Sequence, residues 1–384
     1  MLSRFLGCWD EDFYGGDKVR EFEEAWRDYF GVRHAISVNS NTSGLIAAVG
    51  AIGIEPGDQI IVSPWTMCAT ATSILVWNAI PVFADIEKET FNLDPESIRK
   101  CITPKTKAII VTDIFGHAAR LDEIMGIARE HGLKVIEDAA QAPGALYGER
   151  YVGTIADIGV FSLNYHKHIH TGEGGMCVTD NDDLAERLQL IRNHGEAVVE
   201  GKGVSDITNM IGFNFRLGEI EAAIGIEQLK KLDGQISIIT DRAVKLTHGL
   251  AGLPGLQTPR VLDGCSHVFY VYPLIYDPEE TAVPRARLLE ALRAEGVRIG
   301  GGYQNIHLLP MYQKKTAYGN HGFPWSVFDP EGSVSYAKGI CPVAEKLHDQ
   351  TFLVLPMCLF DYSDEDIASI TEAFQKVWRN MDSL

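Results

Sequence analysis

Apolar runs of strand length alternate with helical patterns along residues 17–138. The predicted strands are 35–38, 59–63, 81–85, 108–112 and 133–137, and the predicted helices are 17–30, 44–52, 68–77, 95–101 and 121–131. Strands that are joined through helices run parallel, and the helices cover both faces of the sheet. The sequence therefore predicts an α/β fold with a mostly parallel central sheet covered by helices.

The pattern changes further along the chain. A helix is expected at 182–194, a mobile loop at 195–209, and a long helix within 212–232 that carries Ile220, Ile224 and Leu229 on one face. Later predicted strands are 267–276, 297–299 and 351–356, and later predicted helices are 284–295, 341–348 and 364–379, the last capped by Ser363. Residues 301–336 have no clear period, and long loops of this kind are usually functional. We expect a large domain over residues 1–235 and a smaller C-terminal α+β domain over residues 236–384.

Composition limits the classes of partner. The chain has 384 residues and a net charge of −18, which argues against nucleic acid as the main partner. No run of 18 or more apolar residues occurs, so no membrane span is expected. The first residues, MLSRFLGCWDEDF, lack the apolar core of a signal peptide. Seven scattered cysteines without a CxxC pair favour free thiols over a zinc site, and we expect a cytoplasmic protein.

One lysine lies between two apolar runs in the segment GVFSLNYHKHIHTGEGGMCVT, residues 159–179. The runs at 158–163 and 176–179 have the pattern of buried strands. Burying an ammonium group costs several kcal/mol unless it is paired or neutralised. A lysine held in such a place can lose its charge and act as a nucleophilic amine. Lys167 is therefore a candidate for an imine with a carbonyl cofactor, and the alternative is an exposed loop lysine.

A small polar turn, residues 39–43, lies between a predicted strand and a predicted helix. The free N–H groups and the positive end of the helix dipole would meet there, and together they form an anion site. The alternative is a plain helix cap by Asn, Ser or Thr.

Asp138 directly follows the predicted strand at 133–137. Ligands of such sheets bind at the carboxyl ends of the strands, where the sequence also places Asn39, Trp65, Asp113 and Ser162. A carboxylate at this position can hold a protonated ring nitrogen, as in pyridoxal phosphate (PLP) enzymes, and Gln141 could bond to a ring hydroxyl. The alternatives are a helix N-cap for Asp138 and a solvated side chain for Gln141.

Four motifs together resemble the DegT/DnrJ/EryC1/StrS family of sugar aminotransferases, which are PLP-dependent enzymes of fold type I. The motifs are NSNTS at 39–43, EDAAQ at 137–141, FSLNYHKHIHTGEGG at 161–175 and GFNFRLGEIEAA at 212–223. They keep the order and approximate spacing of the family, and the resemblance extends over nearly the whole chain. It implies that the large domain binds PLP.

The resemblance also implies roles for individual residues. Lys167, six residues before Glu173, matches the lysine that forms the Schiff base with PLP. Asp138 matches the carboxylate on the pyridine nitrogen, and Gln141 matches the partner of the ring oxygen. His307 matches a histidine near the substrate.

The phosphate of the cofactor would be held by residues of two subunits. Thr42, Ser43 and Ser162 match the phosphate partners within one chain. Asn214 matches an asparagine that reaches the cofactor phosphate of the neighbouring subunit. The resemblance therefore implies a homodimer with shared active sites.

The chain departs from the family pattern at three places. Asn41 stands where the family usually has glycine, and asparagine tolerates positive φ better than most residues. The position that stacks on the cofactor ring, usually aromatic, is Met67, with Trp65 two residues earlier as the alternative and as a candidate substrate contact. The segment 313–338 is longer than usual.

The resemblance implies a transaminase of amino-sugar biosynthesis. An amino acid, expected to be glutamate, would donate its amino group to a keto sugar, expected to be nucleotide-linked. Lys167 would bond to the cofactor and then move the proton between the donor Cα and the cofactor C4′.

Two alternatives stay open. One is a PLP-dependent dehydratase of keto sugars, because family members with that activity carry histidine at the lysine position and His166 and His168 flank Lys167. The other is a regulatory protein without catalysis on the same fold. The intact set of Lys167, Asp138 and Ser162 argues against the regulatory protein, as does the lack of a basic DNA-reading segment.

Overall fold

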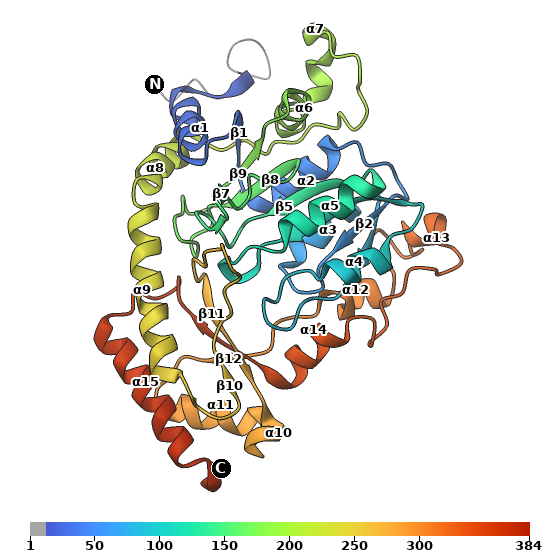
Figure 1. Cartoon of the computed structure of the whole chain (residues 1–384). Coiled ribbons are helices and arrows are strands. Elements are labelled where there is room, and N and C mark those ends of the chain that lie inside the picture. The colour runs from blue at the N-terminus through green and yellow to red at the C-terminus, as the bar shows by residue number, and fades with distance from the viewer. Residues whose placement is uncertain (1–12) are drawn as a thin grey trace.

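A seven-stranded sheet forms the centre of the larger part of the molecule (Figure 1). The structure is a computed structural model and describes residues 13–384. The strand order is β1-β9-β8-β5-β4-β2-β3, and among these strands only β9 runs antiparallel to its neighbours. The strands are β1 (His34–Val38), β2 (Gln59–Val62), β3 (Ile80–Phe83), β4 (Thr106–Thr112), β5 (Lys134–Asp138), β8 (Ile158–Ser162) and β9 (Gly175–Thr179). The predicted α/β fold with a mostly parallel sheet is confirmed.

Helices cover both faces of this sheet. One face packs against α2 (Asn41–Ala51), α3 (Cys68–Val76) and α6 (Asp182–Arg192), and the other against α1 (Asp17–Phe30), α4 (Pro95–Cys101), α5 (Leu121–His131) and α8 (Glu219–Leu229). Successive strand residues point to opposite faces, so Ile60 and Val62 join one apolar core and Ile61 joins the other. Because both faces are covered, most residues of these strands are apolar, although β5 begins with Lys134 and ends with the buried Glu137 and Asp138.

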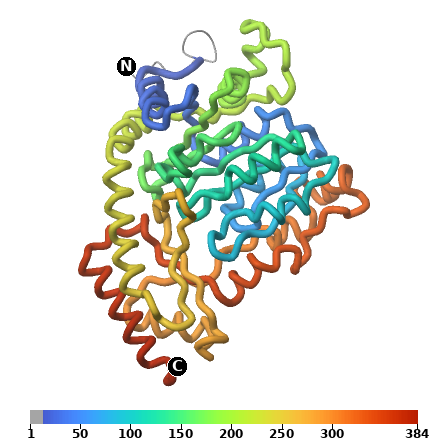
Figure 2. The backbone as a smooth tube through the Cα atoms, in the orientation of Figure 1, coloured from blue at the N-terminus to red at the C-terminus, as the bar shows by residue number. Residues whose placement is uncertain are grey.

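A smaller antiparallel sheet has the order β10-β11-β13-β12. Its strands are β10 (Leu256–Gln257), β11 (Val271–Tyr276), β12 (Gly300–Gly301) and β13 (Phe352–Pro356), and its helices are α9 (Leu232–Leu250), α10 (Pro278–Thr281), α11 (Arg285–Ala294) and α15 (Asp364–Arg379). Figure 2 shows α9 running from the large sheet to the small one, beside α15. The predicted domain boundary between residues 235 and 236 falls inside α9 and stays a prediction.

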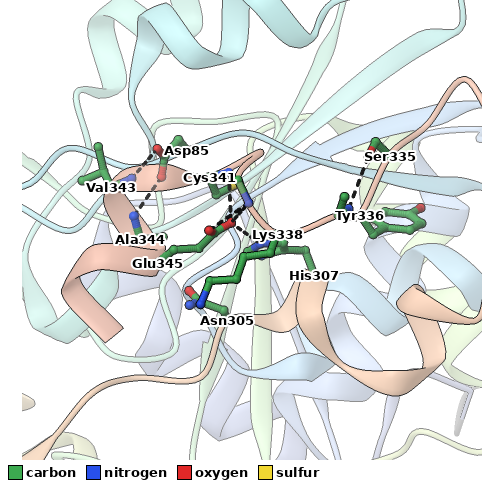
Figure 3. A network of polar contacts seen from close by, with 12 residues as sticks. Asp85, Asn305, His307, Ser335, Tyr336, Lys338, Cys341, Val343, Ala344 and Glu345 are labelled. Atoms are coloured by element: carbon green, nitrogen blue, oxygen red, sulfur yellow. Dashed lines mark hydrogen bonds and ion pairs between the residues drawn. The ribbon is translucent and has the colours of Figure 1, made fainter. Parts of the chain in front are cut away.

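The chain between β12 and β13 packs against β3, which is the edge strand of the large sheet. It contains the short helices α12 (Pro310–Gln313), α13 (Trp325–Phe328) and α14 (Pro342–Lys346). The Tyr336 hydroxyl donates a 2.8 Å hydrogen bond to the Pro81 carbonyl oxygen of β3. Asp85, just after β3, accepts from the N–H groups of Val343 and Ala344 at the start of α14 (Figure 3). The segment thus covers a sheet edge that would otherwise expose unpaired backbone groups.

Several predicted elements differ from the structure. The long helix expected within 212–232 is α8, which begins at Glu219 after its extended N-cap Gly218. Of its expected apolar face, Leu229 is buried, whereas Ile220 is 65% exposed and Ile224 is 43% exposed. The sequence did not predict α9.

Two shorter segments also correct the predictions. The loop expected at 195–209 contains the 3-10 turn η3 (Gly195–Ala197) and the helix α7 (Val199–Lys202). The strand expected at 297–299 lies instead at Gly300–Gly301, which pairs with β13. The remaining strands, β6 (Leu146–Tyr147) and β7 (Arg150–Tyr151), form a small hairpin.

Two findings bear on the expected environment of the protein. No helix of residues 13–384 is both long enough and apolar enough to cross a lipid bilayer. The six cysteines within those residues are all free thiols. The expectation that the chain lacks a signal peptide concerns its first residues, of which 1–12 lie outside the part that the structure describes.

Candidate active site

A cavity of about 210 Å³ lies at the carboxyl ends of the central strands β4, β5 and β8. Six residues of the predicted site line it: Thr42, Met67, Asp138, Gln141, Ser162 and Lys167. The remaining lining comes from Ser40, Asn41, Thr66, Ala69, Thr112, Ala140, Asn164, His166, Glu173, Tyr270 and Tyr303. The fold thus collects residues from distant parts of the chain at the place where a parallel sheet binds its ligands.

Lys167 lies in the connection between β8 and β9 and reaches the cavity wall. Its Nζ atom lies 4.3 Å from the centroid of the Tyr270 ring. Burial lowers the pKa of Lys167 to about 8, and this effect outweighs the opposing attraction of Asp138. Lys167 is half-buried rather than exposed, and the lowered pKa increases the neutral fraction of its amine near neutral pH.

The two histidines beside Lys167 have different surroundings. His168 is buried outside the cavity lining, and its Nε2 atom lies 2.8 Å from the Val268 carbonyl oxygen. His166 does line the cavity, and burial lowers its pKa. Both histidine rings also lie near Tyr270, with centroid distances of 6.0 and 6.4 Å, but only the charge of Lys167 among these three side chains acts on Asp138.

Asp138 is buried at the end of β5 and faces the cavity. Its Oδ2 atom accepts a 2.8 Å hydrogen bond from the Thr70 hydroxyl. Its Oδ1 atom accepts two longer bonds, 3.3 Å from the Ala140 N–H group and 3.4 Å from the Asn41 side chain. Burial raises the pKa of Asp138, whereas the hydrogen bond from Thr70 lowers it. No helix follows Asp138 directly, so the helix-cap alternative is wrong.

Gln141 is buried, which excludes the alternative of a solvated side chain. Its Oε1 atom accepts a 2.8 Å hydrogen bond from the N–H group of Phe115. The amide nitrogen of Gln141 has two protons to donate, and the Gln141 side chain also hydrogen-bonds the Tyr303 hydroxyl at the cavity. Phe115 adopts a left-handed backbone conformation with φ of 62°, which is unfavourable for a large side chain and is found at functional sites.

The turn at 39–43 forms the start of α2, with Ser40 as its N-cap. The Ser40 hydroxyl oxygen accepts from the Ser43 N–H group over 3.1 Å, so a helix cap is present as well. Within residues 13–384, the N–H groups of Asn41 and Thr42 have no acceptor. They therefore remain available to an anion at this end of the cavity.

The structure bears on two expectations about this turn. Asn41 does not adopt positive φ, because it occupies the first helical position of α2. Ser43 does not line the cavity, and its hydroxyl donates a 2.6 Å hydrogen bond to Asn39 Oδ1, so its contact with a cofactor phosphate stays a prediction. The neighbouring Ser40, which the prediction did not assign to the phosphate, lines the cavity instead.

Besides Ser43, three predicted site residues lie outside the lining of this cavity. Trp65 is buried, and its indole N–H group donates to Asn305 Oδ1 over 2.7 Å. His307 is buried with its Nε2 atom 3.0 Å from Glu345 Oε1.

Asn214 is the third of these residues, and it is exposed. Its carbonyl oxygen accepts from the Asn39 side chain over 3.3 Å. The N-cap of α8 is Gly218, so the alternative that Asn214 is a helix cap is wrong. The segment 313–338 contributes no residue to the cavity lining.

Sequence reasoning missed several residues that line the cavity. Thr112 is buried, and its hydroxyl has no partner within residues 13–384. Its place at the end of a predicted strand beside Asp138 was a usable signal. Tyr270 lies in the predicted strand at 267–276 and Tyr303 in the predicted loop at 301–336, and no motif marks either as a site residue.

Comparisons with known proteins identify the family. The profile of the DegT/DnrJ/EryC1/StrS aminotransferase family matches residues 9–375. The chain is 37% identical over 314 residues to a GDP-perosamine synthase of Caulobacter vibrioides, covering 80% of this chain and 82% of the relative. It is 33% identical over 371 residues to an L-glutamine:2-deoxy-scyllo-inosose aminotransferase of Streptomyces fradiae, covering 94% and 86%.

A solved structure, DesI in the presence of its TDP-sugar product, superposes with a TM-score of 0.80 and 28% identity, covering 96% of this chain and 87% of that one. Motif, fold and cavity agree with these matches. The chain therefore belongs to the DegT/DnrJ/EryC1/StrS aminotransferase family.

Proposed function

We propose that PLP binds in this cavity, with its aldehyde at Lys167 and its ring nitrogen at Asp138. The groups present fit such a ligand: an amine of lowered pKa, a buried carboxylate, and free N–H groups at the start of α2. The unpartnered Thr112 hydroxyl and the amide nitrogen of Gln141 add polar groups that a bound ligand would satisfy. The single observation that carries the proposal is that Lys167 and Asp138 face one cavity.

Each residue has a defined task in the proposed transamination. Bound PLP supplies an electron sink for the negative charge that develops at the donor Cα. Asp138 holds the ring nitrogen in its protonated form, and Thr42 and Ser162 bind the phosphate. Gln141 donates to the ring oxygen, and Met67, 63% exposed at the cavity, covers one ring face. Lys167 accepts the proton from the donor Cα and returns it at C4′ of the cofactor.

The proposed acceptor is a keto sugar linked to a nucleotide. This proposal rests on the names of relatives, a GDP-perosamine synthase and a structure with a TDP-sugar product. Glutamate is the proposed amino donor. Glutamine is the second candidate, because one relative is named for L-glutamine.

Purified enzyme loaded with PLP tests the function directly. We expect amination of at least one member of a panel of GDP- and TDP-linked keto sugars, with glutamate or glutamine as donor. Mass spectrometry of the sugar product measures the transfer of the amino group. Elimination of water from a keto sugar without transfer of nitrogen would instead support the dehydratase. A preparation that binds PLP without either activity would favour the regulatory protein.

We further propose a homodimer with shared active sites in the cytoplasm. Ile220 and Ile224 of α8 are exposed apolar side chains, and Met67 and Tyr165 beside the cavity are each 63% exposed. Such a surface fits a second copy of the chain. Asn214 would cross this interface to the cofactor phosphate of the partner.

Mixed dimers test the shared site. A dimer of one Lys167→Ala chain and one Asn214→Ala chain has one site with both defects and one intact site. We expect the mixture to regain activity that both parent homodimers have lost. If native mass spectrometry detects mixed dimers without regained activity, Asn214 acts within its own subunit.

A further inference from the structure

Thr70 lies behind Asp138 and gives this carboxylate its shortest hydrogen bond. The two oxygen atoms, Thr70 Oγ1 and Asp138 Oδ2, are 2.8 Å apart. Thr70 is fully buried in the first turn of α3 and does not itself line the cavity. It can therefore act on a ligand only through Asp138.

A second threonine lies next to Thr70, and the carboxylate fixes the direction of both hydrogen bonds. Thr66 Oγ1 lies 2.8 Å from Thr70 Oγ1, and both side chains are buried. A hydroxyl group has one proton to donate, and an ionised carboxylate only accepts. The Thr70 proton therefore points to Asp138, and the Thr70 oxygen accepts the proton of Thr66.

The count of donors leaves one acceptor position on Asp138. A carboxylate offers about four lone-pair positions. The N–H groups of Ala140 and Asn41 occupy those of Oδ1, and Thr70 occupies one of Oδ2. The free position is on Oδ2, so a protonated ring nitrogen would share this oxygen with the Thr70 hydroxyl.

We propose that Thr70 is a positioning residue of the reaction, which holds Asp138 ionised and directs its free Oδ2 lone pair to the ring nitrogen of the cofactor. Thr66 orders Thr70, and the inference rests on the proposed function. A hydrogen bond to the ionised form stabilises that form, so its loss makes Asp138 more basic. The proton would then move from the ring nitrogen to the carboxylate, and the ring would become a weaker electron sink. Two charged groups interact with Asp138: Lys167, which lowers the pKa of Asp138, and the buried Asp113, whose own pKa Asp138 raises.

The test compares Thr70→Val with Thr66→Val in the PLP-loaded enzyme. Hydrogen bonds to charged groups account for roughly tenfold to hundredfold effects, so we expect Thr70→Val to lower kcat by about that factor. KM should change by less than about threefold, because the charge develops after the substrate has bound. Thr66→Val changes the cavity lining but leaves the Thr70 hydroxyl on Asp138, so we expect kcat to fall by less than in Thr70→Val. Thr70→Ser should restore the rate.

A spectroscopic signature separates positioning from general damage. With PLP labelled with nitrogen-15 in the ring, nuclear magnetic resonance reports whether that nitrogen is protonated. We expect a protonated nitrogen in the wild type and in Thr66→Val, and a shift towards the neutral form in Thr70→Val. If Thr70→Val does not fold, the comparison of Thr70→Ala with Thr70→Ser carries the same test.

Two results would overturn the inference. In one, Thr70→Val matches Thr66→Val in both kcat and nitrogen chemical shift, while the wild type binds PLP and transfers amino groups. That result leaves the proposed function intact. In the other, the wild type itself forms no PLP adduct, and the proposed function fails together with the inference.

Discussion

Two buried acids follow strands of the same large sheet, yet their surroundings are opposite. Asp138, at the end of β5, faces the cavity. The positive charge of Lys167, which lines the same cavity, lowers the pKa of Asp138. Asp85, just after β3, binds the N–H groups of Val343 and Ala344 over 2.8 and 3.1 Å. Around Asp85 the protein itself supplies every partner, whereas around Asp138 a place for a ligand remains.

The neighbours of Asp85 follow the same rule (Figure 3). Glu345 accepts from the N–H group of Gly339 over 2.7 and 2.8 Å, and its Oε1 atom lies 3.0 Å from His307 Nε2. A basic and an acidic side chain thus contact each other directly and hold the segment before β13 on the sheet edge. Buried charges that the chain pairs itself maintain structure, and those that it leaves facing a cavity are available for chemistry.

The largest expected effect comes from removing the Lys167 amine, which lines the cavity together with Asp138. Lys167→Ala should lower transamination by at least about a thousandfold, because both the covalent attachment and the proton transfer use its amine. Thermal unfolding should change little, because Asp138 keeps its hydrogen bonds from Thr70, Ala140 and Asn41. Steady-state assays and calorimetry measure the two effects. An active Lys167→Ala enzyme would place the chemistry elsewhere.

Asp138→Asn should have the next largest effect. A neutral amide cannot hold the ring nitrogen protonated, so we expect kcat to fall by about a hundredfold or more while PLP stays bound. Absorbance of the bound cofactor and single-turnover rates measure both properties. Turnover near that of the wild type would remove Asp138 from the proposed mechanism.

Glu345→Ala tests the region around Asp85 and Glu345, where the chain supplies the partners of its own buried acids. It leaves the Gly339 N–H group and His307 without their acceptor, so we expect a loss of about 3 kcal/mol of stability. The kcat of the folded enzyme should stay within about threefold of the wild type. Urea denaturation measures the loss, and Glu372→Ala, at an exposed position of α15, is the matched control. A large fall in kcat without a loss of stability would support the predicted role of His307 near the substrate.

The smallest expected effect is a pH dependence of cofactor attachment. The pKa of Lys167 is about 8, so its neutral, reactive fraction grows up to tenfold per pH unit below that value and levels off above it. The rate at which apo-enzyme takes up PLP, followed by absorbance from pH 6 to about 9.5, should show this profile. A rate that still rises about tenfold per pH unit up to pH 9.5, without levelling off, would show that burial does not activate this amine.

The sequence predicted the residues around Asp138 better than those around Asp85. Strand ends, the lysine between two strands and the polar turn are local patterns, and they located Lys167, Asp138, Gln141 and Thr42. The resemblance that assigned His307 to the substrate did not show that this side chain pairs with Glu345, because Glu345 is 38 residues away in the sequence. Such contacts depend on how the chain packs, which residue periodicity does not encode.

The same reason explains the errors in the fold. Predicted elements with strong local signals, such as α5 and α15, have the predicted bounds. The long helix α9 has no predicted counterpart, and β12 pairs through two glycines that carry no strand pattern. Ile220 and Ile224 show a related ambiguity, because an apolar helix face looks the same in sequence whether its own chain or a partner covers it.

The attachment point of the cofactor is the most direct test of the account. PLP-loaded enzyme is reduced with borohydride, digested and analysed by mass spectrometry. We expect a single modified peptide that contains residues 164–173, with the added mass on Lys167. A modified lysine at any other position, or no modified lysine at all in enzyme that aminates sugars, would contradict the central claim.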